Sequence, residues 1–391
     1  MTETVVELPD PRIFPDVGSA APEAASLHML AAASLAAATG PRAEESAREL
    51  RRALAHGLAS DGATLAALID GAPSVAIARH LWRQLDAVWC ELTVDRAAGL
   101  AVTVFAVPLV VVAGVLAANA DTTLRGVLEA PQRLADILTE HRALAGNRSF
   151  ALAAALCSAD AIDLARLPEL FAWQRLPDGP HFGVALRRRA LAPAPLALVA
   201  GREGVHLRFL VGSAVAKPGV DLLVDSAVGA WGLPLSREVS RQLAVPGASV
   251  LALPRAPNRP LPAVWQGRMA QREVGAQIFA SNAIRRLRAS VGEPTAVISA
   301  HRAADAPQGG ELRLSLSSPF DSRDAEGFRC PLHPLDRVGD VVTMLTNLLA
   351  DCRVTDIRVL PGVHADRDPA TGLPLLFKPE TIPPATTAAV H

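Results

Sequence analysis

The sequence predicts an α+β protein, with a mostly helical N-terminal domain followed by an α+β domain of two similar strand-strand-helix-strand units. Three observations support this class. Apolar residues recur at helical spacing through roughly the first 175 residues, short runs of strand-forming residues bounded by glycine and proline begin near residue 180, and the same order of elements returns later. With 391 residues, half of them hydrophobic, the chain is long enough for two domains with a sizeable core.

Changes in composition divide the chain into four segments. The first is acidic and proline-rich and has neither the basic start nor the apolar centre of a signal peptide, so we expect a protein that is not secreted. The expected segments are an irregular leader over 1–22, a mostly helical domain over 23–179 with a buried apolar segment at 97–120, an α+β domain over 180–379, and a flexible tail over 380–391.

Five segments of the helical domain have helical spacing. The first ends at Gly40, which suits a left-handed C-terminal cap, and Pro41 suits the first turn of the second. Ser74 is a candidate N-cap for the third, which places six apolar side chains on one face. The expected helices cover residues 22–39, 41–60, 75–92, 131–146 and 158–176. The apolar face of the third helix consists of Ile77, Leu81, Leu85, Val88, Trp89 and Leu92.

The apolar segment at 97–120 has no charge between Arg96 and Asp121, a length that would allow a membrane span. Pro108 near its middle would kink a helix, its many β-branched residues favour a strand, and no arginine cluster on one flank sets an orientation. We therefore expect a buried element of a soluble core, either two short strands bent at Pro108 or one strand leading into a helix. The alternatives are a membrane span and a surface covered by a partner.

The α+β domain contains two segments, 195–254 and 295–361, that we interpret as copies of one unit. Each has strands, a helix and a closing strand that ends in Leu-Pro, although few residues match between them. Ser236 and Asp336 are candidate N-caps of the two helices. The other expected elements are a joining helix over 262–291 that ends at Gly292 and a terminal hairpin over 364–377.

The sequence contains no complete metal or cofactor signature, so we expect neither a metal nor a cofactor. Cys330 and His333 have the spacing of half a zinc site, but no second half of comparable form is present. Asp366 and Asp368 begin like a calcium loop, but the later glutamate is missing and an ordinary turn explains the pair.

No catalytic residue can be assigned from the sequence, which contains neither a nucleophile elbow nor a phosphate-binding loop. A serine or cysteine nucleophile with a distant histidine stays open, because such sites assemble in space. Folding could bring His301 and His364 together, but the sequence gives them no role.

The net charge of −1 hides an asymmetry along the chain. Residues 1–180 carry 14 of the 38 basic and 21 of the 39 acidic side chains, so the first part is acidic and the remainder basic. Such halves can dock on each other or lead subunits to associate, and the alternative is two unrelated domains. The basic clusters Arg187–Arg189 and Arg285–Arg288 lack a recognition signature, which argues against a nucleic-acid partner.

Composition gives the setting in which we expect the protein to act. Four widely spaced cysteines fit a reducing compartment, and a basic set with lysine only at 217 and 378 fits a GC-rich bacterial genome. The favoured function is a non-enzymatic subunit or assembly factor of a larger bacterial complex in the cytoplasm, with a protein partner or self-association. The alternatives are an enzyme with a ligand site between the two C-terminal units and a membrane-associated component anchored by 97–120.

Overall fold

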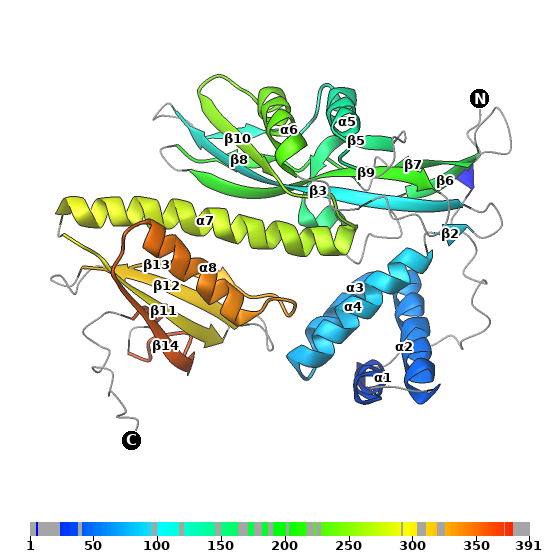
Figure 1. Cartoon of the computed structure of the whole chain (residues 1–391), viewed down its shortest axis with the longest axis horizontal. Helices are drawn as coiled ribbons and strands as arrows, with labels where there is room; N and C mark the ends of the chain where they lie inside the picture. Colours follow the sequence, from blue (N-terminus) through cyan, green and yellow to red (C-terminus); the bar gives the residue numbers. More distant parts are fainter. Residues whose placement is uncertain are drawn as a thin grey trace. The chain divides into compact units, whose positions relative to one another are not determined.

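The chain is described by a computed structural model (Figure 1), in which the α+β class is confirmed. It forms two compact units, the first containing Met1–Ile69 and Ile77–Gln271 and the second Asp70–Ala76 and Arg272–His391. The boundary predicted at residue 180 lies inside the first unit, because the main sheet of that unit takes strands from both sides of it. The described residues are 5–6, 24–37, 41–92, 94–95, 100–116, 121–144, 150–162, 171–175, 182–186, 191–200, 203–216, 223, 228–290, 292–302, 310–318, 325–370 and 372–377.

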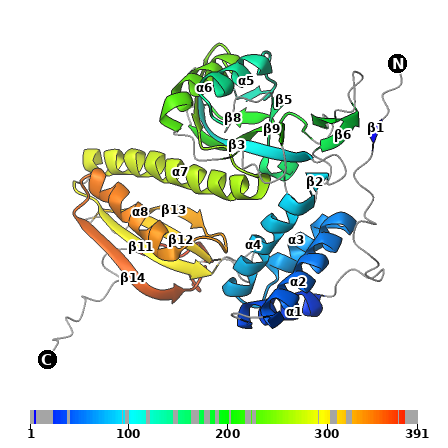
Figure 2. The ribbon, with the colours of Figure 1, turned by 45° about the vertical axis from the view of Figure 1, so that its right-hand side comes forward.

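After the short strand β1 (Val5–Val6), the described chain continues with four helices (Figure 2), and three of them confirm predicted helices. The third in order was not predicted. Its N-cap is Asp61, whose Oδ1 accepts hydrogen bonds from the backbone N–H groups of Ala63 and Thr64 at 3.0 and 3.1 Å. Hydrogen bonds from Thr64 hold the pKa of Asp61 below its usual value. The helices are α1 (Ala24–Ala36), α2 (Pro41–Ser60), α3 (Gly62–Asp70) and α4 (Val75–Leu92).

The apolar segment forms one strand, β3 (Leu100–Val115), of which Phe105, Val107 and Val111 are fully buried. It therefore forms a single strand rather than two short ones, and it does not lead into a helix. None of the helices in the described ranges is long and apolar enough to cross a membrane. The strand order of the sheet is β10-β3-β9-β5, with β2 also paired to β3. The partners of β3 are β2 (Val94–Asp95), β9 (Gly204–Ala216) and β10 (Ala248–Pro254), and β5 (Phe150–Cys157) pairs with β9.

Pro108 lies in the middle of β3 without interrupting it. Its carbonyl accepts a hydrogen bond from Arg255 N at 2.8 Å, so its nitrogen faces the same side, where β10 has ended at Pro254. Two residues earlier, Ala106 and Asn258 exchange both backbone hydrogen bonds, at 2.8 and 3.0 Å. The missing N–H of the proline thus falls beyond the end of the β10 ladder, which explains why the strand continues through it.

One face of this sheet is covered by α5 (Pro131–Glu140) and α6 (Val228–Gln242), as Figure 1 shows. The fully buried Trp231 of α6 belongs to the same apolar core as Phe105 and Val111 of β3. A charge-free strand is stable here because its side chains are removed from water on both faces of the sheet.

The other face of the sheet contacts the first half of α7 (Pro260–Ser290), which confirms the predicted joining helix. Gly267 lies so close to β9 that a Cβ at this position would lie 2.7 Å from Leu207 Cδ1. A larger residue here would force the side chains of Leu207 and Phe209 to move, so a glycine favours this close approach. The helix ends before Gly292, whose φ of 100° is the left-handed conformation expected of a C-terminal cap.

The helix predicted over 158–176 is wrong where the structure describes it. A short 3-10 helix, η2 (Ala159–Ile162), is followed by a strand, β6 (Phe171–Arg175), and residues 163–170 lie outside the described ranges. Phe171 and Trp173 alternate with smaller or polar residues at the period of a strand.

The small sheets are β1 (Val5–Val6) with β6 and β7 (Phe182–Leu186), and β4 (Thr122–Leu124) with β8 (Leu196–Leu198). Apart from β1, the predicted leader lies outside the described residues, as does the tail over 380–391.

Ser236 is not the N-cap of α6, which already begins at Val228. Its hydroxyl instead donates to the carbonyl of Ala252 in β10, and Ser240, one turn later, accepts a hydrogen bond of 3.1 Å from the N–H of the same residue. Among the strands that the structure describes, β10 is the outermost of its sheet, and these two serines satisfy backbone groups of Ala252 that point away from β3.

The second unit contains a four-stranded sheet of order β13-β12-β11-β14. β11, β12 and β13 are antiparallel neighbours, and β14 is parallel to β11. One face is apolar, and α8 together with the second half of α7 packs on it, with Leu345, Leu349, Ala280 and Leu314 in one core. The elements are β11 (Thr295–Arg302), β12 (Gly310–Ser317), β13 (Ala325–Pro331), α8 (Val338–Asp351) and β14 (Asp356–His364).

The two predicted units share an order of elements but not a strand pairing. In 195–254 the order is strand, strand, helix, strand as expected, and 295–361 contains the additional strand β13. The two segments are therefore not equivalent copies. In the first segment β8 pairs with β4, and β3 separates β9 from the closing strand β10. In the second segment the closing strand β14 lies directly beside the first strand, β11. The long strand β3, which lies outside both segments, determines this difference.

Asp336 also differs from its predicted role, because Arg337 is the N-cap residue of α8. Its carboxylate accepts hydrogen bonds from the backbone N–H of His333 at 2.9 Å and from Arg272 at 2.6 Å. The terminal hairpin is confirmed by the 2.9 Å hydrogen bond from the N–H of Asp368 to the carbonyl of Leu373.

We predict that Val111→Asp lowers the free energy of unfolding by several kcal/mol, because the new carboxylate would be buried without a partner in the fully buried centre of β3. Urea denaturation followed by circular dichroism measures the change. The matched control is Val127→Asp, at a position that is 46 % exposed, where we expect a shift within about 0.5 kcal/mol. Equal shifts for the two variants would contradict the buried position of β3.

We also predict that Ser236→Ala costs about 1–3 kcal/mol of unfolding free energy, because the carbonyl of Ala252 loses its buried donor. Ser290→Ala is the control, since that hydroxyl is exposed and bonds only within its own helix. The same urea titration compares them. A loss for Ser236→Ala no greater than for the control would show that the edge of β10 does not depend on this serine.

Candidate functional site

A groove between α1, α2 and α4 is the candidate binding site of the first unit. Its volume is about 610 Å³, within the range of ligand-binding pockets. We call it the arginine groove. Its lining residues are Ser34 from α1, Ala43, Glu44, Ala47, Arg48, Arg51, Arg52 and Ala55 from α2, and His80, Gln84 and Val88 from α4.

The sequence of α2 explains why a groove forms beside it. Leu50, Leu54 and Leu58 are buried on one stripe of the helix. The stripe beside it carries Ala43 and Ala47, one helical turn apart, with arginines between these small residues and Ala55. Alanine side chains leave space between the helices, and the long arginine side chains reach outward over that space.

Two hydrogen bonds between helices fix the walls of the groove. Arg51 Nε donates to Gln84 Oε1 at 3.0 Å, which links α2 to α4. His80 Nε2 lies 3.0 Å from the hydroxyl oxygen of Ser34, which links α4 to α1. The three helices are therefore held by polar contacts as well as by the leucine core. A binding site whose walls are fixed in this way is formed before its ligand arrives.

The groove is positively charged. Arg48, Arg51 and Arg52 line it together with one carboxylate, that of Glu44, among the residues described. Arg48 and Arg52 are exposed and form no ion pair within the described ranges. Burial lowers the pKa of His80, and the neighbouring Arg83 lowers it further, so the imidazole is neutral at pH 7. The arrangement can bind an anion, because a guanidinium fork matches a carboxylate or phosphate.

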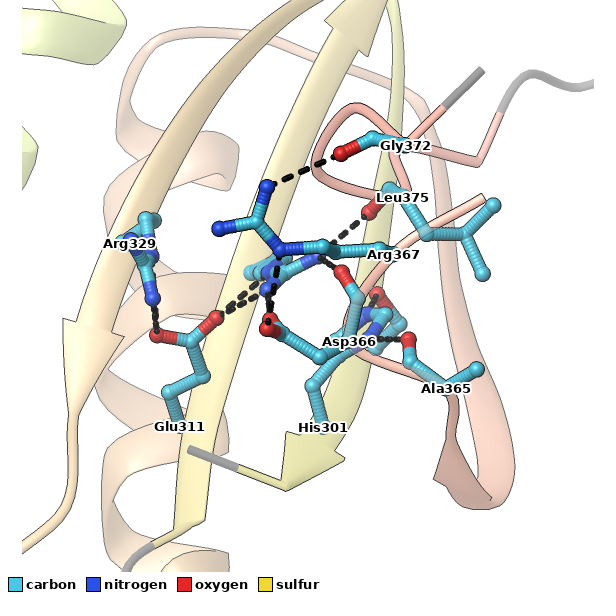
Figure 3. Close-up of polar contacts among 10 residues, drawn as sticks. His301, Glu311, Arg329, Ala365, Asp366, Arg367, Gly372 and Leu375 are labelled. Carbon is cyan, nitrogen blue, oxygen red and sulfur yellow. Dashed lines mark hydrogen bonds and ion pairs between the residues drawn. The ribbon is translucent and has the colours of Figure 1, made fainter. Parts of the chain in front are cut away.

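A second polar cluster lies on the opposite face of the second unit's sheet from α8 (Figure 3). Arg313 of β12 is fully buried, and all three of its guanidinium nitrogens donate hydrogen bonds. They bind Glu311 Oε1 at 2.5 Å, the carbonyls of Asp366 and Leu375 at 2.6 and 3.0 Å, and the Asp366 carboxylate. Arg329 donates to the other oxygen of Glu311 at 2.9 Å. We call these residues the Arg313 network, and they hold the terminal hairpin on the sheet.

Folding does bring His301 and His364 together, with ring centroids 5.9 Å apart. His301 Nδ1 lies 2.7 Å from the carbonyl of Ala365 and so must donate to it, which makes Nε2 the acceptor for the Ser299 hydroxyl at 2.8 Å. Burial lowers the pKa of His301. A neutral histidine beside a serine is the chemistry of a nucleophile and its base, but both side chains are only 1 % exposed and a substrate would not reach them.

The partial metal motifs of the sequence are used in packing and turns. Cys330 is fully buried among apolar residues, and burial raises the pKa of its thiol to about 12, which disfavours the thiolate that zinc needs. His333 Nδ1 accepts the N–H of Leu335 at 3.2 Å. Asp368 Oδ1 accepts the N–H of Ala370 at 2.9 Å, an ordinary turn contact. The described part of the chain contains no group of three metal-ligating side chains.

The two basic clusters of the sequence do not form the candidate site. Arg187–Arg189 lies outside the described residues. Within Arg285–Arg288, on α7, Arg286 pairs with Glu326 and Arg288 pairs with Glu293 at 3.0 Å. Nothing in the sequence marks Arg48, Arg51 and Arg52 as a site, although Arg48 lies three and four positions before the adjacent pair Arg51 and Arg52, a spacing that places it near both on a helix.

Comparison with known proteins found no similar protein. No family model matches the chain, and neither curated proteins nor solved structures gave a match.

We predict that Arg313→Met lowers the free energy of unfolding by about 3–5 kcal/mol, because Glu311 and Asp366 lose their shared buried cation. Arg329→Met is the control. Its side chain is 52 % exposed, so the loss of its bond to Glu311 should cost about 1 kcal/mol or less. Urea denaturation measures both. Similar losses would contradict the central role of Arg313 in the network.

Proposed function

We propose that this protein is a non-enzymatic subunit or assembly factor of a larger bacterial complex, and that it docks a partner protein in the arginine groove. We place this activity in the cytoplasm, in keeping with four cysteines that are all free. The observation that carries the proposal is the pair Arg48 and Arg52, two exposed guanidinium groups without ion partners in the described ranges, over a groove with an alanine-lined wall.

The composition of the groove suits a protein partner. Arginine is enriched in protein interfaces, where its planar group forms several hydrogen bonds and its alkyl stem packs on apolar surface. Ala43, Ala47 and Val88 supply that apolar surface, and Gln84 and Ser34 supply adaptable hydrogen-bonding groups.

The test is a pull-down from native lysate with mass spectrometry, comparing the full chain with the charge-reversed variant Arg48→Glu/Arg52→Glu. We expect a partner that the unaltered chain retains and this variant loses at least tenfold, because two attractive contacts become repulsive.

The matched control is Arg125→Glu/Arg237→Glu, which makes the same change of charge at exposed positions away from the groove. Circular dichroism checks that both variants remain folded. Retention of every partner by the groove variant, or equal loss from both variants, would refute docking in the groove.

A further inference from the structure

We infer that the arginine groove takes an acidic segment of the partner, and that His80 gains a proton when this segment binds. The inference rests on the proposed function and adds two properties to it, the chemical class of the partner segment and a pH-dependent affinity.

The spacing of the arginines fits a row of carboxylates. Arg48 lies three positions before Arg51 and four before Arg52 on α2, so its Cβ atom is about 5–6 Å from each of theirs. Carboxylates two residues apart on an extended chain, or one turn apart on a helix, are separated by a similar distance. The guanidinium groups of Arg48 and Arg52 can each hold a carboxylate through two parallel hydrogen bonds, whereas Arg51 already donates to Gln84 and adds positive charge beside them.

The lining of the groove favours carboxylates of a protein over a nucleic-acid strand. Single-stranded nucleic acid is held by stacking its bases on aromatic side chains as well as by charge. The described lining residues include neither phenylalanine nor tryptophan, and the wall beneath the arginines consists of Ala43, Ala47, Ala55 and Val88. Small aliphatic side chains between acidic residues would pack on this wall.

His80 is placed to respond to the charge of a bound segment. Its ring lines the groove and bonds to Ser34 of α1 at 3.0 Å. The charged groups around it are Arg83 on its own helix and Arg48, Arg51, Arg52 and Glu44 on α2. Before binding, burial and this positive surrounding disfavour the imidazolium. Carboxylates seated among the arginines offset this positive charge and so favour the imidazolium form of His80.

The direction of the pH effect follows from linkage. If binding raises the pKa of His80, the complex holds more protons than the free partners, so affinity increases as pH falls through the interval between the two pKa values. The gain is at most tenfold for each unit by which the pKa rises. The acidic segment stays ionised because glutamate has a pKa of about 4.3, so measurements between about pH 5.5 and 7.5 isolate the histidine.

The experiment uses the purified full chain and a peptide of about twelve residues that alternates glutamate and serine and carries a rhodamine label, whose charge does not change over this pH range, with binding followed by fluorescence anisotropy at low salt. We expect binding that is about three- to tenfold tighter near pH 5.5 than near pH 7.5. His80→Gln should bind with little change over this range. His56→Gln is the matched control, because His56 lies on α2 but does not line the groove, and it should keep the dependence. Arg48→Glu/Arg52→Glu should abolish binding.

Four results would overturn the inference. If the affinity for the peptide does not change with pH, binding is not coupled to protonation of His80. If the pH dependence persists in His80→Gln, another group takes up the proton. A labelled oligothymidylate of similar length that binds as tightly, with the same sensitivity to Arg48→Glu/Arg52→Glu, would point to phosphate ligands instead. Absence of peptide binding at any pH, together with a partner that is lost from the groove variant in the pull-down, would refute the acidic segment while leaving the docking proposal in place.

Discussion

The arrangement of the first unit follows from one constraint, which is that the side chains of β3 must be removed from water on both faces of its sheet. This strand has no charged side chain over its length, and its centre is fully buried. A strand of this kind is stable only if helices cover both faces of its sheet and neighbouring strands pair with both edges. The chain supplies these elements from far apart in the sequence, with α5 and α6 on one face, the first half of α7 on the other, and β9 and β10 at the edges.

The same residue type has two distinct roles, and its partners decide which. Arg313 is fully buried and donates from all three nitrogens, so its charge is neutralised within the fold. Arg48 and Arg52 lie at the surface with no ion partner in the described ranges, so their charges are available to another molecule. A count of arginines in the sequence cannot separate these cases, because it contains no information about which carboxylates lie nearby after folding.

Sequence patterns predicted local structure well and long-range pairing poorly. The helices α1, α2, α4 and α8 follow from apolar spacing within each segment, which local side chains determine. The strand through Pro108 depends on where β10 ends, and the serine contacts of α6 depend on β10 lying at the edge of the sheet, and both are tertiary properties. The sequence allows His301 and His364 to meet in space, but it does not show that His301 is buried with its Nδ1 bonded to the carbonyl of Ala365. The groove escaped notice because it requires three helices at once.

The serine contacts of α6 have a consequence beyond stability. An outer strand with free N–H and C=O groups is a template on which another extended chain can add. β10 is largely aliphatic, with the sequence ASVLALP, and carries no charge that would repel such an addition. Ser236 and Ser240 occupy the outward backbone groups at Ala252, so the helix acts as a guard against aggregation as well as a cover for the core. Substitutions at these two serines would therefore be expected to reduce solubility before they abolish folding.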